Sequence, residues 1–166
     1  MWRPARADNA QTALVLTAID VGKELYAVTV YFDAMAQDSS VTLSCGGDAR
    51  LMADRSLFQR AVNNLVSNAI RHSPPGGKVQ LRAVTCPDGA VEVQVVDEGC
   101  GIAPEELPHV FERFYRGVNG RSSTEGAGLG LAIVRSIMTL HGGTVSLTNA
   151  AGGGVVATLR FPVVAG

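Results

Sequence analysis

The spacing of apolar residues along the chain predicts three helices. From Asp20 to Gln37 the residues Val21, Leu25, Val28, Phe32 and Met35 recur at the period of a helix that buries one face. A second helix is expected between Asp54 and Pro74, since proline cannot continue a helix. Its expected buried stripe consists of Phe58, Val62, Leu65 and Ala69. A third helix is expected over 129–141. Asp20 and Asp54 are typical N-cap residues, which supports two of these starting points.

The alternation of apolar and polar residues predicts the strands. Two clear runs, 78–84 and 91–97, flank the turn sequence Pro-Asp-Gly and indicate a hairpin. Shorter runs indicate further strands at 41–43, in a segment ending at Asp54, at 144–148 and at 155–161. Helices and strands in this order fit an α/β (α+β) two-layer sandwich, in which about three helices cover one face of a mixed sheet.

The segment over about 102–125 follows neither period. Nineteen of the 166 residues are glycine, more than the average usage of about 7%, and glycine clusters lie at both ends of this segment. Irregular segments of this length inside a domain are usually functional. The sequence therefore predicts a lid with glycine hinges.

Composition narrows the range of partners. Fourteen Lys and Arg stand against fifteen Asp and Glu, so the formal net charge is −1 and indicates no basic surface for nucleic acid or a membrane. The three cysteines are widely spaced without a C-x-x-C pair, which argues against a disulfide framework or a zinc site. No stretch is apolar enough to span a bilayer. We therefore expect no nucleic-acid partner and no direct membrane insertion of this chain.

Two asparagines on the second predicted helix form the first candidate site. Asn64 and Asn68 are four residues apart and share a face, and Arg71 follows one turn later. Amide oxygens bind Mg²⁺ without adding negative charge that would repel phosphates. A guanidinium binds phosphate through two donors. Taken alone, however, these residues more often form a solvated helix face.

Two glycine motifs provide a second and a third candidate. Asp97 ends a predicted strand and begins a D-x-G-x-G sequence, where a carboxylate can accept a hydrogen bond from an exocyclic amine and glycine allows a ligand to approach. A G-x-G-x-G sequence at 126–130 precedes the third helix, whose free N–H groups would face phosphates. Each motif is also typical of an ordinary turn. Their occurrence together with the asparagine face favours a nucleotide site.

Four segments resemble the sequence boxes of sensor histidine kinases. In the order of that family, the N box is similar to NNLVSNAIRHS, the G1 box to DEGCGI, the F box to FERFYRG and the G2 box to GAGLGL. The resemblance extends from about Asp20 to Phe161. It implies the catalytic and ATP-binding domain of a sensor histidine kinase. It also implies the mostly antiparallel sheet of the Bergerat fold, which gyrase-, Hsp90- and MutL-type (GHKL) proteins share.

The resemblance also implies roles for single residues. Asp97 would bind the adenine amine, Arg116 in the lid would reach the γ-phosphate or the partner domain, and His72 would stack on adenine where the family commonly has an aromatic residue. The implied catalytic residues are Asn64, Arg71 and Arg116, and the implied Mg²⁺ ligands are Asn64 and Asn68. The implied ATP-binding residues are Asn64, Asn68, Arg71, His72, Asp97, Gly99, Gly101, Ile102, Phe111, Gly126, Gly128, Leu129, Gly130 and Leu131.

The implied activity is transfer of the γ-phosphate of Mg-ATP to a histidine on a separate dimerisation domain, for relay to a response regulator. ATP-hydrolysing relatives have a glutamate where this chain has Asn64. Because an amide cannot deprotonate water, a kinase is favoured over a hydrolase. A catalytically silent docking module is the other alternative. None of His72, His109 and His141 lies in a sequence that resembles the phosphoacceptor box.

The resemblance further suggests how the chain is organised. Residues 1–19 are expected to be a linker and a remnant of the dimerisation helix. The ATP-binding domain is expected at 20–166, with its lid at about 102–125. Such a domain belongs in the cytoplasm, as part of a longer protein of the bacterial inner membrane. The sequence is most similar to sensors of the heavy-metal type.

Overall fold

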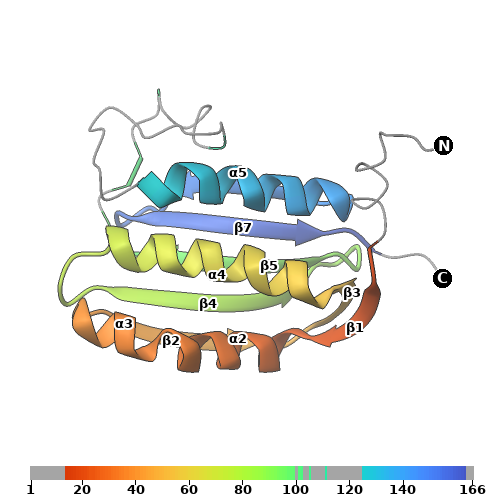
Figure 1. Cartoon of the computed structure of the whole chain (residues 1–166), viewed down its shortest axis with the longest axis horizontal. Helices are drawn as coiled ribbons and strands as arrows, with labels where there is room; N and C mark the ends of the chain where they lie inside the picture. Colours follow the sequence, from red (N-terminus) through yellow and green to blue (C-terminus); the bar gives the residue numbers. More distant parts are fainter. Residues whose placement is uncertain (1–13, 100, 103–104, 106–110, 112–124, 164–166) are drawn as a thin grey trace.

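The computed structural model describes residues 14–99, 101–102, 105, 111 and 125–163, with backbone alone for 125–129. Helices and strands alternate along this part of the chain (Figure 1). In chain order they are β1 (Leu16–Asp20), α2 (Val21–Tyr31), α3 (Asp33–Asp38), β2 (Thr42–Gly47), β3 (Arg50–Asp54), α4 (Arg55–His72), β4 (Lys78–Thr85), β5 (Val91–Asp97), α5 (Glu125–Leu140), β6 (Thr144–Asn149) and β7 (Val155–Phe161).

A five-stranded sheet in the order β2-β4-β5-β7-β6 forms one layer. Strands β2 and β4 are parallel, and the other neighbouring pairs are antiparallel. Helices α2, α4 and α5 lie side by side on one face of this sheet, with α4 in the middle (Figure 1). The predicted two-layer sandwich with a mixed, mostly antiparallel sheet is therefore confirmed.

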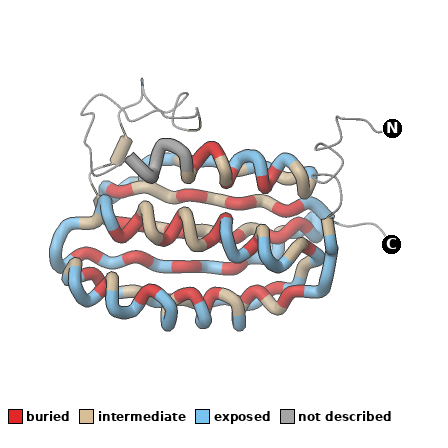
Figure 2. Tube along the Cα trace, in the orientation of Figure 1, coloured by how far each residue is buried: buried red, intermediate tan, exposed pale blue. Residues whose placement is uncertain are grey.

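The core lies between these two layers. The predicted stripe of α4 is buried along its whole length, from Phe58 to Ala69. Strand β5 alternates between buried and half-buried residues, so that one of its faces packs under the helices (Figure 2). The rings of Phe58 and Phe161 pack with their centroids 5.7 Å apart. Hydrophobic burial between the helix layer and the sheet thus fixes the position of α4.

The first predicted helix is divided in the structure. Helix α2 ends at Tyr31 and α3 begins at Asp33, so the prediction of one helix from Asp20 to Gln37 was wrong at this point. The intervening Phe32 is buried and leaves the helical conformation, with φ −94° and ψ 8°. Beyond this bend Ala36 is the buried residue and Met35 is only partly buried. The bend thus keeps the end of the segment against the core.

Strand β1 was not predicted. Its antiparallel partner is β3, with Ile19 opposite Leu51, and the two strands form a separate small sheet. Ile19 is fully buried, so part of the range 1–19, which was expected to be a linker, packs into the core. Residues 1–13 lie outside the described residues. None of the helices that the structure describes is long and apolar enough to cross a bilayer.

Asp54 fixes the N-terminal end of α4. Its Oδ1 atom accepts a hydrogen bond from Leu57 N (3.2 Å), as an N-cap does, and its Oδ2 atom accepts one from Val15 N (3.1 Å). These bonds lower the pKa of the Asp54 carboxyl. The backbone N–H of Asp54 donates to Nε2 of His141 (3.1 Å), just beyond α5. One residue therefore joins α4, α5 and the beginning of β1.

Replacing Asp54 with alanine removes the cap of α4 and the acceptor for Val15. We expect the Asp54→Ala variant to lose about 1 kcal/mol of unfolding free energy, and about 2 kcal/mol at most. Urea denaturation followed by circular dichroism would measure the loss. Asp54→Asn keeps an acceptor oxygen and should retain most of the stability. An alanine variant as stable as the wild type would contradict the capping role.

Candidate functional site

The polar face of α4 lies against α5. Asn64 is next to the first turns of α5, since a Cβ placed on Gly130 would lie 3.8 Å from Cγ of Asn64. One helical turn further on, Oδ1 of Asn68 is buried, and the described residues provide no hydrogen-bond partner for it. A buried amide oxygen without a donor costs about 1–3 kcal/mol. Oδ1 of Asn68 is therefore a buried acceptor whose hydrogen-bonding capacity the described residues leave unused.

The last turn of α4 presents Arg71 and His72. The Nη1 atom of Arg71 donates to Oγ of Ser67 at 2.9 Å, which holds the guanidinium along the helix. Partial burial lowers the pKa of His72, and the neighbouring Arg71 charge lowers it further, while the charge of Asp97 raises it. The neutral imidazole is therefore favoured near pH 7.

Asp97 ends β5, as predicted, and its side chain is buried with only 7% of the residue exposed. Its Oδ1 atom accepts hydrogen bonds from Gly99 N (2.8 Å) and Val155 N (3.2 Å). Within the described part of the chain no group donates to Oδ2. Burial raises the pKa of the Asp97 carboxyl, and the two backbone hydrogen bonds oppose this shift. One carboxylate oxygen is thus fixed by the protein, while the other is available to a ligand.

Close packing brings the end of β5 to the end of α4. A Cβ on Gly99 would lie 2.5 Å from the carbonyl oxygen of His72, a distance that only glycine permits. Asp97 and His72 are therefore neighbours, while Asn64 and Gly130 are neighbours at the other end of the polar face. Asn64 and His72 are eight positions apart on the helix, which corresponds to a rise of about 12 Å. The candidate site is an elongated surface along α4 with a carboxylate at one end and amides at the other.

The remaining residues predicted for the site lie in three different settings: some contact other parts of the fold, some begin α5, and some are outside the described residues. Ile102 is half-buried, and its backbone is bonded to the side chain of Asn149. Leu131 is buried in the core. Helix α5 begins at Glu125 and not near Leu129, so Gly126 and Gly128 lie in its first turns and not in a preceding loop. Arg116 and most of the predicted lid, except residues 102, 105, 111 and 125, lie outside the described residues.

Three contacts of this site were not predicted from the sequence. Ser67 holds Arg71, Val155 holds Asp97 through its backbone N–H, and Asn149 holds Ile102. Ser67 lies four residues before Arg71 on the same helix, and this spacing could have indicated the contact. The other two contacts depend on how the β6–β7 turn meets the end of β5, for which the sequence carries no signal.

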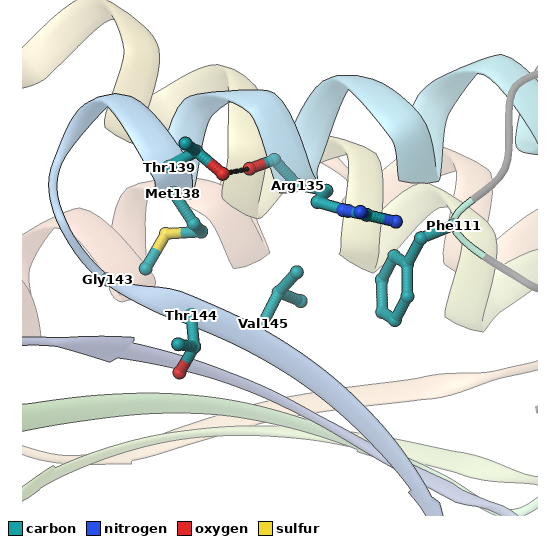
Figure 3. Close-up of a pocket in the computed structure, with 7 residues that line it drawn as sticks. All are labelled: Phe111, Arg135, Met138, Thr139, Gly143, Thr144 and Val145. Carbon is teal, nitrogen blue, oxygen red and sulfur yellow. Dashed lines mark hydrogen bonds between the residues drawn. The ribbon is translucent and has the colours of Figure 1, made fainter. Parts of the chain in front are cut away.

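Phe111 lies in a different environment from the other candidates. An open cavity of about 290 Å³ is found between α5 and the beginning of β6 (Figure 3). It is lined by Phe111, Arg135, Met138, Thr139, Gly143, Thr144 and Val145. Figure 3 shows the guanidinium of Arg135 beside the ring of Phe111. None of the lining residues belongs to α4 or β5, so this cavity is separate from the surface around Asp97.

Residues 53–165 match the protein family described as histidine kinase-, DNA gyrase B-, and HSP90-like ATPase. Among curated proteins, the sensor protein CzcS of Cupriavidus metallidurans is 44% identical over 160 residues, which make up 96% of this chain and 33% of that protein. The chain thus spans about a third of the length of the curated relatives that it matches.

Solved structures share the fold. Full-length ShkA in complex with AMPPNP matches with a TM-score of 0.83 and 27% identity, over 98% of this chain and 34% of that one. The histidine kinase ThkA in complex with the response regulator protein TrrA matches with a TM-score of 0.75 and 26% identity, over 90% of this chain and 42% of that one.

Replacing Asp97 with asparagine tests whether its buried charge lowers stability. Because the folded protein raises this pKa above the ordinary value of 3.8, the folded state binds the proton more tightly than the unfolded state. Stability is therefore lost as the pH rises from 3.8 through the raised pKa. Asparagine carries no charge and keeps an acceptor for Gly99 and Val155. We expect Asp97→Asn to gain stability relative to the wild type over that pH range and then to keep the gain.

Urea denaturation at a series of pH values from about 3.5 to about 8, a range that brackets the shift in pKa, would measure this difference. Asp38→Asn, at an exposed residue on α3, controls for the removal of one negative charge. An Asp97→Asn variant that is less stable than the wild type near pH 7 would show that the carboxylate stabilises the fold.

Proposed function

The chain belongs to the family of histidine kinase-, DNA gyrase B-, and HSP90-like ATPases, and we propose that it is the ATP-binding catalytic domain of a sensor histidine kinase. In this proposal the domain binds Mg-ATP along α4 and transfers the γ-phosphate to a histidine on a separate dimerisation domain. Adenine lies at Asp97 and the phosphates at Asn64 and Asn68.

The buried carboxylate of Asp97 is the observation that carries this proposal. Its Oδ1 atom is occupied by two backbone donors, and no described group donates to Oδ2. A buried charge is costly unless it is hydrogen-bonded. The exocyclic amine of adenine supplies a donor of the right kind. Neutral His72, which lies beside Asp97, provides an aromatic ring that can stack on the same base.

Asn64 and Asn68 fit a magnesium ion that is shared with the phosphates. The Oδ1 atom of Asn68 is buried and lacks a donor among the described residues, and Mg²⁺ prefers oxygen ligands of this type. When bound there, the ion would neutralise part of the triphosphate charge. Arg71 lies one turn beyond Asn68 and is held by Ser67. Its guanidinium would add a donor for a phosphate oxygen.

Phosphoryl transfer to an imidazole needs positioning more than it needs a base. A ring nitrogen forms a bond to the γ-phosphorus while the bond to the bridging oxygen breaks, and ADP leaves with that electron pair. Hydrolysis would require a group that removes a proton from water, and Asn64 cannot do so. The amide at this position therefore favours a kinase over an ATPase.

The accepting histidine must come from outside the described residues. His141 uses both ring nitrogens, because Nδ1 is bonded to the carbonyl oxygen of Ile137 (2.8 Å) and Nε2 accepts from Asp54 N (3.1 Å). His72 belongs to the end of the proposed site that binds adenine. His109 lies outside the described part of the chain. The placements of His72 and His141 therefore support an acceptor on another domain.

The relatives support a proposal for the partner and for the location. CzcS is about three times as long as the matched region and is named a sensor protein, and ThkA has been solved with a response regulator protein. We therefore propose that a response regulator receives the phosphate, and that this chain is the cytoplasmic catalytic part of a longer sensor of the bacterial inner membrane. The heavy-metal subtype rests on sequence resemblance and stays a prediction.

Titration with AMPPNP tests the nucleotide and metal assignments together. We expect calorimetry to detect binding by the wild type, with a higher affinity in the presence of Mg²⁺. Asn68→Ala should lower the affinity in Mg²⁺ about tenfold, to near the value without Mg²⁺, because it removes one metal ligand. Asn63→Ala, the neighbouring asparagine on α4, is the matched control and should bind normally. Asp97→Ala should bind poorly with or without the metal.

The docking-module alternative would be supported if neither the wild type nor Asp97→Ala bound AMPPNP. Binding that responds to Asp97→Ala but not to Asn68→Ala would retain the nucleotide site and reject the magnesium ligand.

Radiolabelled ATP tests the transfer step. We expect the chain alone to remain unlabelled and to hydrolyse ATP slowly, because none of its three histidines lies in a sequence that resembles the phosphoacceptor box and Asn64 cannot act as a base. Addition of a dimerisation domain that carries the phosphoacceptor box should produce labelling of that domain. Persistent labelling of the chain itself, or rapid partner-free hydrolysis, would contradict the assignment.

A further inference from the structure

The turn between β6 and β7 contacts the end of β5 directly. Val155 N donates to Oδ1 of Asp97 at 3.2 Å. Gly154 has φ +91°, and a Cβ at this position would lie 2.0 Å from the carbonyl oxygen of Asp97. The backbone of the turn is therefore packed against Asp97 as closely as a residue without a side chain allows.

Asn149, the last residue of β6, makes a second contact with the chain beyond Asp97. Its Oδ1 atom accepts from Ile102 N, and its Nδ2 atom donates to Ile102 O, each at 2.8 Å. A single amide side chain thus satisfies both backbone groups of one residue, as a neighbouring strand would do. The two bonds have opposite polarity, so Ile102 is fixed in position and in orientation.

The residue before Ile102 fits this contact as well. Gly101 has φ +85°, and a Cβ there would lie 2.9 Å from Oδ1 of Asn149. Any larger residue would be strained in this left-handed conformation and would press on the amide. Asn149 itself is exposed to solvent and contributes little to the hydrophobic core. The two hydrogen bonds of its side chain therefore fix the local backbone conformation at Ile102 more than they stabilise the whole fold.

We propose that Asn149 is a positioning residue of the nucleotide site, which fixes Ile102 relative to Asp97 so that the surface for adenine is formed before the nucleotide binds. This inference rests on the proposed function, because it needs adenine at Asp97. A preformed surface reduces the ordering that binding would otherwise require. Asn149 acts through Ile102 and does not itself contact the nucleotide.

The expected effect is specific to the adenine-binding end of the site. Loss of the Asn149 bonds should weaken ADP and AMPPNP by the same factor, since both contain adenine. We expect about a tenfold loss of affinity for Asn149→Ala, the size of effect typical of one or two lost hydrogen bonds. Asn149→Asp can still accept from Ile102 N but cannot donate to Ile102 O, so its loss should be intermediate.

The experiment compares calorimetric titrations of ADP and AMPPNP for the wild type, Asn149→Ala and Asn149→Asp. Thr148→Ala is the matched control, because Thr148 is the preceding exposed residue of β6 and its side chain points to the opposite face of the strand. Thermal unfolding of each variant is measured in parallel. We expect all variants to unfold at nearly the same temperature, and Thr148→Ala to bind like the wild type.

The outcomes separate this inference from the proposed function. If the wild type binds both nucleotides and Asn149→Ala binds them equally well, the positioning role is overturned and the nucleotide site stands. A loss confined to AMPPNP would place the effect at the phosphates and would also overturn the role. Absence of binding by the wild type would overturn the proposed function and the positioning role together.

Discussion

The position of α4 on the sheet is the constraint on which the candidate site depends. The helix has one apolar stripe and one amide-bearing face, and burial of the stripe between α2, α5 and β5 determines where the other face points. Because Asn64 and Asn68 share the helix with Phe58 and Leu65, the core and the site cannot move independently. Hydrophobic packing is thus the means by which the amide group of Asn64 is held close to Gly130.

A buried carboxylate at the end of β5 is the second requirement of the candidate site, and its burial is expected to lower stability. Burial raises the pKa of Asp97, so its charged form is disfavoured by the fold, and the two hydrogen bonds from Gly99 and Val155 offset only part of this cost. An asparagine would satisfy the same two donors without a charge. In the proposed function, the adenine amine would donate a hydrogen bond to the second oxygen and so offset part of the cost of the buried charge.

Local periodicity was sufficient to predict most of the fold and the positions of the candidate residues on α4 and β5. The stripe from Phe58 to Ala69 and the place of Asp97 follow from patterns within one element. The missed features depend on contacts between distant segments. Strand β1 exists because β3 pairs with it, and Asn149 contacts Ile102 across 47 residues of sequence. The orphaned oxygen of Asn68 is likewise visible only once the neighbouring elements surround it.

The two ends of α4 have different roles: the N-terminal end makes hydrogen bonds that stabilise the fold, and the C-terminal end lies at the candidate site. At the N-terminal end Asp54 is joined to Val15, Leu57 and His141 by side-chain bonds, and these link three elements far from the proposed ligand. At the C-terminal end His72 meets Gly99 through close backbone packing, where no side chain intervenes. A helix that is held by its capped end and by the core keeps its position even when polar atoms near its other end lack hydrogen-bond partners. Near that end, Oδ1 of Asn68 and Oδ2 of Asp97 have no protein donor among the described residues, and the proposed nucleotide and its metal would supply their partners.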